Sequence, residues 1–117
     1  MALRKMVERL RTSVEELDRQ KLSEYCSTLG TTPLDAIEPR RPIRAAGEVR
    51  TVRIVPRAGA AALEATVSDG RGSITAVFLG RRKVAGITPG RKVVIEGVVG
   101  VEGTQKLVYN PVYRLLP

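Results

Sequence analysis

The sequence predicts an all-β core, a five-stranded Greek-key barrel, preceded by one or two N-terminal α-helices. Two observations support this fold class. From Ile43 onward, short β-branched runs alternate with glycine-containing turns at regular spacing, which is typical of barrels built from short strands. Before that point, apolar residues recur at helical spacing as far as Gly30. We therefore expect a helical segment at 1–30, a connector at 31–42 and a barrel at 43–117.

The N-terminal segment fits two helices. One helix face is formed by apolar residues at positions i, i+3, i+4 and i+7, namely Leu3, Met6, Val7 and Leu10. Ser13 followed by Glu16 matches a capping box, which predicts that a second helix begins there. Gly30 is a natural helix end. The apolar face of the first helix has two alternative uses, packing on the barrel or forming a dimer.

Five strands are expected in the barrel. Their predicted ranges are 43–55, 61–68, 73–79, 92–101 and 106–115. The segment 69–72, Asp-Gly-Arg-Gly, indicates a tight hairpin between the second and third strands. Pro89-Gly90 indicates a turn before the fourth strand, and Glu102-Gly103 indicates the last hairpin. A short helix is expected between the third and fourth strands.

Alternation within the strands assigns an inner and an outer face. Leu63, Ala65 and Val67 share one face of the second strand, and Phe78 falls on the inward set of the third. We interpret Phe78 as a core residue in preference to a stacking one. The outer set also contains apolar residues, Val77, Leu79, Val94 and Val98. We expect the N-terminal helices to cover part of that surface.

The charge of the chain favours polyanionic partners. The formal net charge is +8, and it is concentrated in the predicted barrel. Residues 1–41 carry eight Lys and Arg against seven Asp and Glu, a net of +1, whereas residues 42–117 carry twelve against five, a net of +7. Nucleic acid is the commonest soluble polyanion, so it is the expected partner.

The composition argues against an enzyme. The chain has no histidine, the commonest general base, and its single cysteine, Cys26, allows neither an internal disulfide nor a usual zinc site. Cys26 lies in a helical pattern and is expected to be a buried thiol. Gly100-x-x-Gly103 lacks the signature of a phosphate-binding loop. We therefore expect no catalytic residue, no metal and no cofactor.

The location of the protein is expected to be cytoplasmic. No apolar run is long enough to span a membrane, and charged residues occupy the place where a signal peptide would need an apolar stretch. A single cysteine fits a reducing compartment. No membrane partner is expected.

The order of turns and strands resembles a known fold. A strand ends in Ser68-Asp69-Gly70, the run 72–75 opens the next strand, and Pro89-Gly90 precedes a strand that contains Glu96-Gly97. This order resembles the bacterial OB (oligonucleotide/oligosaccharide-binding) fold, and it is similar to the wedge-domain class of the branch-migrating helicase RecG. The whole chain also resembles a group of small actinobacterial OB-fold proteins, through the segments 13–18, 63–65, 79–82, 86–91 and 109–111.

These resemblances imply nucleic-acid binding, with single-stranded or branched DNA as the ligand in preference to RNA. An accessory role in DNA replication, recombination or repair follows from that expectation. Two alternatives stay open, a protein-interaction module that uses the barrel or the N-terminal helices, and an RNA- or ribosome-associated protein. The chain departs from better-known single-strand binders because its strands lack an exposed aromatic stacking platform.

OB barrels bind extended chains across the second and third strands. The candidate nucleic-acid-binding residues are Arg50, Arg53, Arg57, Arg71, Thr75, Arg81, Arg82, Lys83, Arg91, Lys106 and Tyr109. The densest cluster is the run 81–83, which is either a phosphate clamp or the solvated start of the short helix. Arg50, Arg53 and Arg57 do not all share one strand face. Many arginines and few aromatics predict salt-sensitive binding to phosphates, with little sequence specificity.

Overall fold

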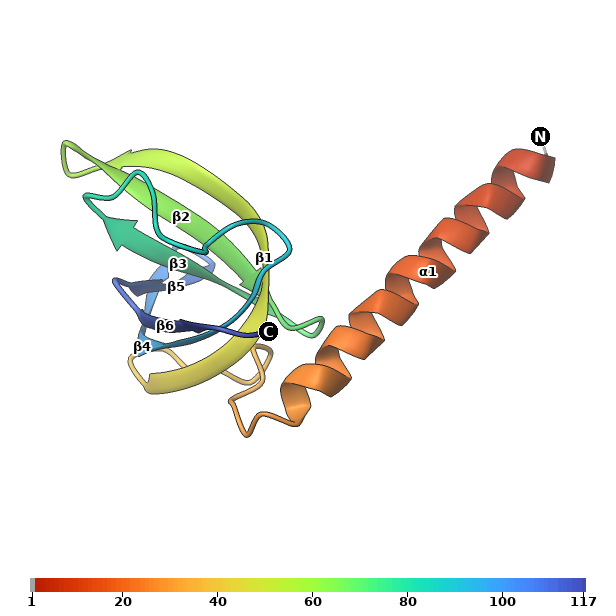
Figure 1. Ribbon diagram of the computed structural model, residues 1–117, viewed down its shortest axis with the longest axis horizontal. Helices are drawn as coiled ribbons and strands as arrows, with labels where there is room; N and C mark the ends of the chain where they lie inside the picture. Colours follow the sequence, from red (N-terminus) through yellow and green to blue (C-terminus); the bar gives the residue numbers. More distant parts are fainter. Residues whose placement is uncertain (1) are drawn as a thin grey trace.

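The computed structural model describes residues 2–117 and shows one long helix beside a β-barrel (Figure 1). The elements are α1 Ala2–Ser27, β1 Pro42–Arg57, β2 Ala60–Ser68, β3 Ser73–Leu79, β4 Lys92–Glu102, β5 Gln105–Tyr109 and β6 Val112–Leu115. The predicted all-β barrel with a preceding helix is confirmed. The predicted last strand, 106–115, is divided into β5 and β6, because Asn110 adopts a left-handed φ of 48° and Pro111 has no N–H to donate.

The long strand β1 closes the barrel because it pairs with two neighbours. Its first half pairs antiparallel with β4, and its second half pairs antiparallel with β2. β3 pairs antiparallel with β2 and parallel with β5, while β4 pairs antiparallel with both β5 and β6. The sheet thereby returns on itself in the order β1-β2-β3-β5-β4, with β1 beside β4.

Gly47 lies where β1 passes from one partner strand to the other. A Cβ added to Gly47 would lie 2.7 Å from the carbonyl oxygen of Ser68 and 2.7 Å from Cγ1 of Val67. Both distances are shorter than carbon atoms tolerate, and one of the two neighbours is backbone. The absence of a side chain therefore permits the close approach of β1 and β2 at this corner.

We expect Gly47→Ala to lower the free energy of unfolding by about 2 kcal/mol, because the strands must separate to admit the methyl group. Urea denaturation measures this change. Gly100→Ala is the matched control, since its Cβ would meet Cδ1 of Leu107 at 3.5 Å, an ordinary contact. That variant should stay within about 0.5 kcal/mol of the wild type. Equal costs at the two positions would contradict the packing argument.

The barrel core contains the four residues that alternation assigned to the inner face, Leu63, Ala65, Val67 and Phe78, together with neighbours of the same strand parity. The buried members from β2, β3 and β4 are Leu63, Ala65, Val67, Ile74, Ala76, Phe78, Val93, Ile95 and Val99. The Phe78 ring meets the Tyr113 ring edge-on, with centroids 5.8 Å apart, so the core interpretation of Phe78 is confirmed. Val84 and Ile87 add to this core from the β3–β4 loop.

The β3–β4 loop, residues 80–91, contains turns and no helix, so the prediction of a short helix there was wrong. Gly80, Gly86 and Gly90 all adopt positive φ, which interrupts a right-handed helix three times in eleven residues. Tyr113 fixes the middle of the loop by donating its hydroxyl hydrogen to the carbonyl oxygen of Ala85 at 2.8 Å. The loop is therefore an anchored, irregular cover of the barrel.

The helix α1 is continuous through the point where a second helix was expected to begin. The capping-box interpretation of Ser13 and Glu16 was wrong. The Thr12 hydroxyl instead donates to the carbonyl oxygen of Glu8 at 3.0 Å, a bond that keeps this side chain within the helix. No glycine or proline occurs between residues 2 and 27 to end the helix earlier.

Only the C-terminal end of α1 touches the barrel, and the rest extends away from it (Figure 1). Leu22 and Cys26 are buried with Ala46, Val94 and Leu116. Cys26 is thus the buried thiol that was expected, and burial raises its pKa to about 11, which keeps it protonated. Among the helices of residues 2–117, none is long and apolar enough to cross a membrane.

We expected the N-terminal helices to cover the outer apolar residues of the barrel. This prediction is correct for Val94 alone. Val77 is buried under Ala62 and Leu107, which belong to the barrel itself. Leu79 and Val98 remain 43% and 59% exposed. The helix cannot reach them because it contacts the barrel only through its last turns.

Candidate functional site

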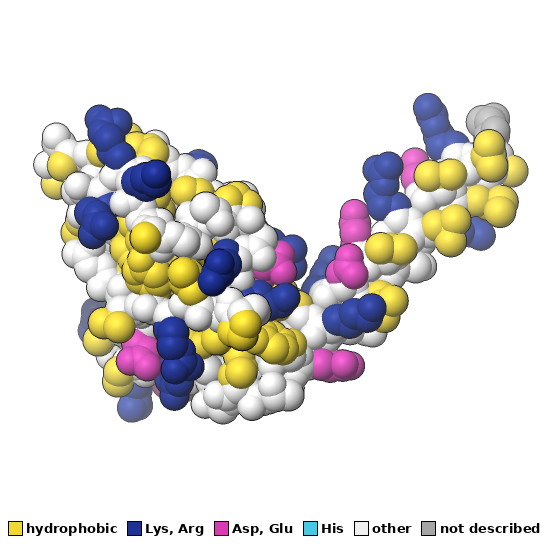
Figure 2. All heavy atoms as spheres, viewed as in Figure 1, with side chains coloured by type: hydrophobic (Ala, Val, Ile, Leu, Met, Phe, Trp, Pro, Cys, Tyr) yellow, Lys and Arg dark blue, Asp and Glu magenta, His cyan; other side chains and the backbone are white. Residues whose placement is uncertain are grey.

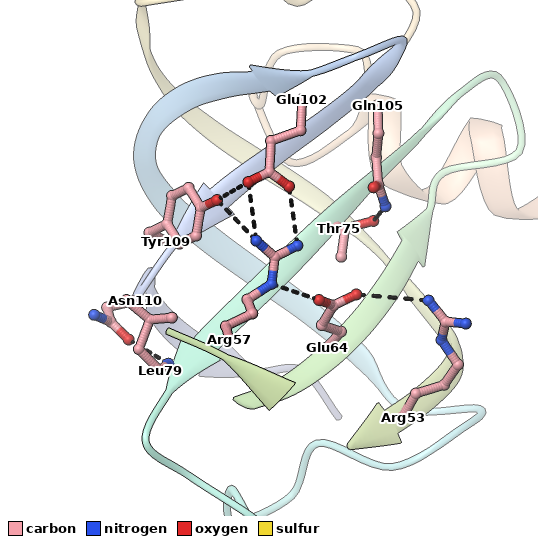
Figure 3. A network of polar contacts seen from close by, with 9 residues as sticks. All are labelled: Arg53, Arg57, Glu64, Thr75, Leu79, Glu102, Gln105, Tyr109 and Asn110. Atoms are coloured by element: carbon pink, nitrogen blue, oxygen red, sulfur yellow. Dashed lines mark hydrogen bonds and ion pairs between the residues drawn. The ribbon is translucent and has the colours of Figure 1, made fainter. Parts of the chain in front are cut away.

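A network of ion pairs occupies the outer face of the barrel where three strands end (Figure 3). Arg57, the last residue of β1, lies at its centre. Its Nε donates to Glu64 Oε2 at 2.7 Å, and its two terminal nitrogens donate to the Glu102 carboxylate at 2.9 and 3.1 Å. Glu64 is only 5% exposed. Arg57 is therefore held by two carboxylates, and its pKa is raised further above its usual value by the hydrogen bonds to Glu102 and Glu64.

Tyr109 completes this network from the end of β5. Its hydroxyl accepts a hydrogen bond from Arg57 Nη1 at 3.0 Å and donates one to Glu102 Oε1 at 2.5 Å. The guanidinium carbon of Arg57 also lies 5.6 Å from the centre of the Tyr109 ring. Donation to Glu102 raises the pKa of Tyr109, while the hydrogen bonds from Arg57 and then Tyr109 lower the pKa of Glu102. Both candidate binding residues are already engaged within the protein.

Arg53 and Thr75 belong to the same face. Arg53 pairs directly with Glu64 across β1 and β2, with 3.6 Å between Nη2 and Oε1, and its side chain is 69% exposed. Thr75 is buried, and its hydroxyl accepts a hydrogen bond from Gln105 Nε2 at 2.8 Å. Arg50 lies apart from this network, because it pairs with Glu48 at 3.1 Å and lies beside Lys21 and Tyr25 of α1.

The charges of this face cancel. The two arginines of the network, Arg53 and Arg57, are matched by the two carboxylates, Glu64 and Glu102. Glu64 and Glu102 were not singled out from the sequence, because their contact with Arg57 depends on the register of β1 against β2 and on where β4 ends. The face that OB barrels use for ligands is therefore locally neutral in this protein.

The run Arg81, Arg82 and Lys83 lies at the edge of the same face. It begins one residue beyond β3, after Gly80. The last residue of β3, Leu79, pairs with Ala62 and donates its N–H to Asn110 Oδ1 at 2.9 Å. The three cationic side chains are exposed and form no ion pair with any acidic group of residues 2–117. Figure 2 shows Lys and Arg side chains placed around hydrophobic ones over this part of the barrel.

The remaining candidate residues lie elsewhere on the barrel. Arg71 pairs with Asp35 at 3.3 Å, and Arg50 pairs with Glu48 at 3.1 Å. Lys106 donates from Nζ to the carbonyl oxygen of Ile37 at 2.8 Å, which fastens the connector to β5. Arg91 is exposed at the far end of the β3–β4 loop. These four side chains are not brought together with the run 81–83.

The run 81–83 and, at the other end of the loop, Arg91 are therefore the exposed candidate cations without an acidic partner among the described residues. In the described part of the chain, no group of three or more His, Cys, Asp or Glu side chains is placed to hold a metal ion. The run 81–83 offers three positive charges, and this chemistry suits the binding of phosphate groups.

Among the solved structures that match, two contain chains with a similar fold. A chain in the crystal structure of the S. pombe Stn1–Ten1 complex matches with a TM-score of 0.52 and 18% identity, over 65% of this chain and 58% of that one. A chain in the structure of a replication protein A heterotrimer bound to single-stranded DNA matches with a TM-score of 0.50 and 19% identity, over 72% of this chain and 63% of that one. No protein-family model and no curated protein matches the sequence.

The likeness establishes the OB fold for the barrel, so the fold implied by the sequence resemblance is confirmed. At this identity it establishes the fold alone. The chain spans about three-fifths of the length of the two chains that it matches.

Proposed function

We propose that this protein binds nucleic acid through its OB barrel and holds the phosphate backbone of single-stranded or branched DNA. The observation that carries the proposal is the exposed run 81–83, three cations without an acidic partner among the described residues, at the edge of the β2–β3 face. The net charge of +7 on residues 42–117 extends this attraction over the barrel. A binding protein of this kind needs no catalytic group.

Backbone binding is favoured over base stacking because the barrel has few aromatic side chains and each of them contacts another residue. Phe78 is buried in the core, the Tyr113 ring packs edge-on against it, and the Tyr109 ring, 41% exposed, has the Arg57 guanidinium 5.6 Å from its centre. Stacking on bases requires exposed ring faces. Binding should therefore depend on phosphates and discriminate little among sequences.

The comparisons support DNA as the ligand class. One of the similar structures contains single-stranded DNA. The expectation of branched DNA rests on the resemblance of the order of turns and strands to the wedge class of the helicase RecG. We propose an accessory role in DNA replication, recombination or repair on this basis.

The test is fluorescence anisotropy with single-stranded DNA, forked DNA, duplex DNA and single-stranded RNA over a series of salt concentrations. We expect the first two probes to bind most tightly. If about four phosphates are neutralised on a single strand, log K should fall with log salt at a slope near −3. A flat salt dependence would contradict the phosphate mechanism. If RNA bound more tightly than either DNA probe, RNA and not DNA would be the ligand. No binding of any probe at low salt would overturn the proposal.

A further inference from the structure

The helix α1 carries an apolar stripe that the barrel does not cover. The stripe consists of residues spaced alternately four and three apart, Leu3, Val7, Leu10, Val14 and Leu17. Their exposed fractions lie between 49% and 74%. Figure 2 shows hydrophobic side chains along the part of the helix that extends away from the barrel. A helical segment without tertiary contacts is only marginally stable in water. We therefore expect this stripe to pack against a partner.

The spacing of the stripe is that of a coiled coil. Three leucines occupy the d positions of successive heptads, and Val7 and Val14 occupy the a positions between them. The pattern is also self-complementary, since the same stripe provides both knobs and holes. A second copy of this helix therefore fits the surface.

The stripe points away from the barrel, so a second helix can reach it. Leu22 and Cys26 face the barrel. At 100° per residue, Leu17 is rotated about 140° from Leu22 and about 180° from Cys26 around the helix axis. The β2–β3 hairpin, in which Gly70 lies against Arg19, contacts the helix on the side opposite to Leu17. No part of the described barrel lies over the stripe.

Charge along the helix selects the orientation of the two copies. The first half, residues 2–12, has four basic residues and one acidic residue, a net of +3. The second half, residues 13–27, has two basic and four acidic residues, a net of −2. A parallel pair would place like halves together, whereas an antiparallel pair places each half against its opposite. Antiparallel pairing also brings the flanking Arg4 of one copy beside Asp18 of the other.

We infer that the protein forms a homodimer in which the two α1 helices pair antiparallel through this stripe. The interface is two-fold symmetric, so each copy uses the same surface and the assembly closes at two. Val7 of one copy packs against Leu17 of the other, and Val14 packs against Leu10. The two barrels lie at opposite ends of the helix pair. The inference is independent of the proposed nucleic-acid binding.

The first test is the mass of the full chain in solution, measured by sedimentation equilibrium over a wide concentration range. We expect twice the chain mass of 12.7 kDa. Leu10→Glu should give a monomer with lower helix content by circular dichroism, because a carboxylate would be buried in the interface. Thr12→Glu adds the same charge on the other side of the helix and should remain dimeric. A monomeric wild type, or equal effects of the two variants, would overturn the inference.

The second test addresses orientation by disulfide formation between two single variants, Val7→Cys and Leu17→Cys. An oxidised equimolar mixture should contain mainly the mixed disulfide, because positions 7 and 17 meet across an antiparallel pair. Cys26 is buried with a raised pKa and should not compete. Mass spectrometry distinguishes the mixed product from the two homodisulfides. Homodisulfides as the main products would indicate parallel pairing and overturn the proposed orientation.

Discussion

Replacing Arg81, Arg82 and Lys83 with Ala should weaken binding to a short single-stranded DNA by about a hundredfold at about 0.1 M salt. Each phosphate contact on a single strand contributes about 0.7 to the slope of log K against log salt, and therefore about 0.7 of a decade in affinity at this salt. The loss of three contacts should also reduce the slope from near −3 to near −1. Anisotropy titrations at several salt concentrations measure both quantities.

The matched control removes three cations from the helix, with Lys5, Arg9 and Arg11 replaced by Ala. This variant has the same net charge as the first, but the changed residues lie far from the β2–β3 face. A probe of about six nucleotides is short enough to occupy a single barrel, so any change in helix pairing would not alter its affinity. We expect less than about a threefold loss in the control. Equal losses in the two variants would show that net charge, and not the run 81–83, determines binding.

Arg57→Ala should lower the free energy of unfolding by about 2 kcal/mol, because it removes the closest partner of a buried carboxylate. Glu64 would retain only the 3.6 Å contact with the exposed Arg53. Urea denaturation with an unchanged m-value would report this loss as a change in stability. Arg53→Ala is the control, and it should cost less than about 0.5 kcal/mol because that side chain is 69% exposed.

A second substitution separates the loss of the ion pair from the loss of packing. The double variant Arg57→Met with Glu64→Leu replaces the pair with apolar side chains and should recover most of the stability. The mutant cycle for Arg57 and Glu64 should then give a coupling energy above about 1 kcal/mol. If Arg57→Ala proved as mild as Arg53→Ala, the network would be a surface feature, and Arg57 would again be available as a ligand-binding residue.

The fold could be predicted from the sequence because its signals are local. Alternation placed Leu63, Ala65 and Phe78 in the core, and the Asp69–Gly72 segment marked the hairpin between β2 and β3. The errors have local causes as well. Ser13 and Glu16 match a capping box, yet the residues around them are good helix formers, and Thr12 bonds within the helix. The β3–β4 loop is long enough to form a short helix, but its glycines adopt positive φ and prevent it.

The site could be predicted only in part, because its ion pairs and hydrogen bonds join side chains that lie far apart in the sequence. The positions of the arginines follow from the strand pattern, but their pairing does not. Arg57 meets Glu102 across 45 residues, and Lys106 meets Ile37 across 69. Such pairs depend on the register between strands, which the sequence pattern left open. The run 81–83 was found because it is contiguous and has no acidic neighbour in sequence.

The length of α1 determines how two barrels would share one nucleic acid. Its 26 residues extend about 39 Å at 1.5 Å per residue, and in the antiparallel pair this stiff spacer separates the barrels. A strand shorter than that span reaches one barrel only. A longer strand reaches both, and its second attachment benefits from a high effective concentration. The length of the helix would thus set the ligand length above which two barrels of modest affinity bind one strand together, with avidity.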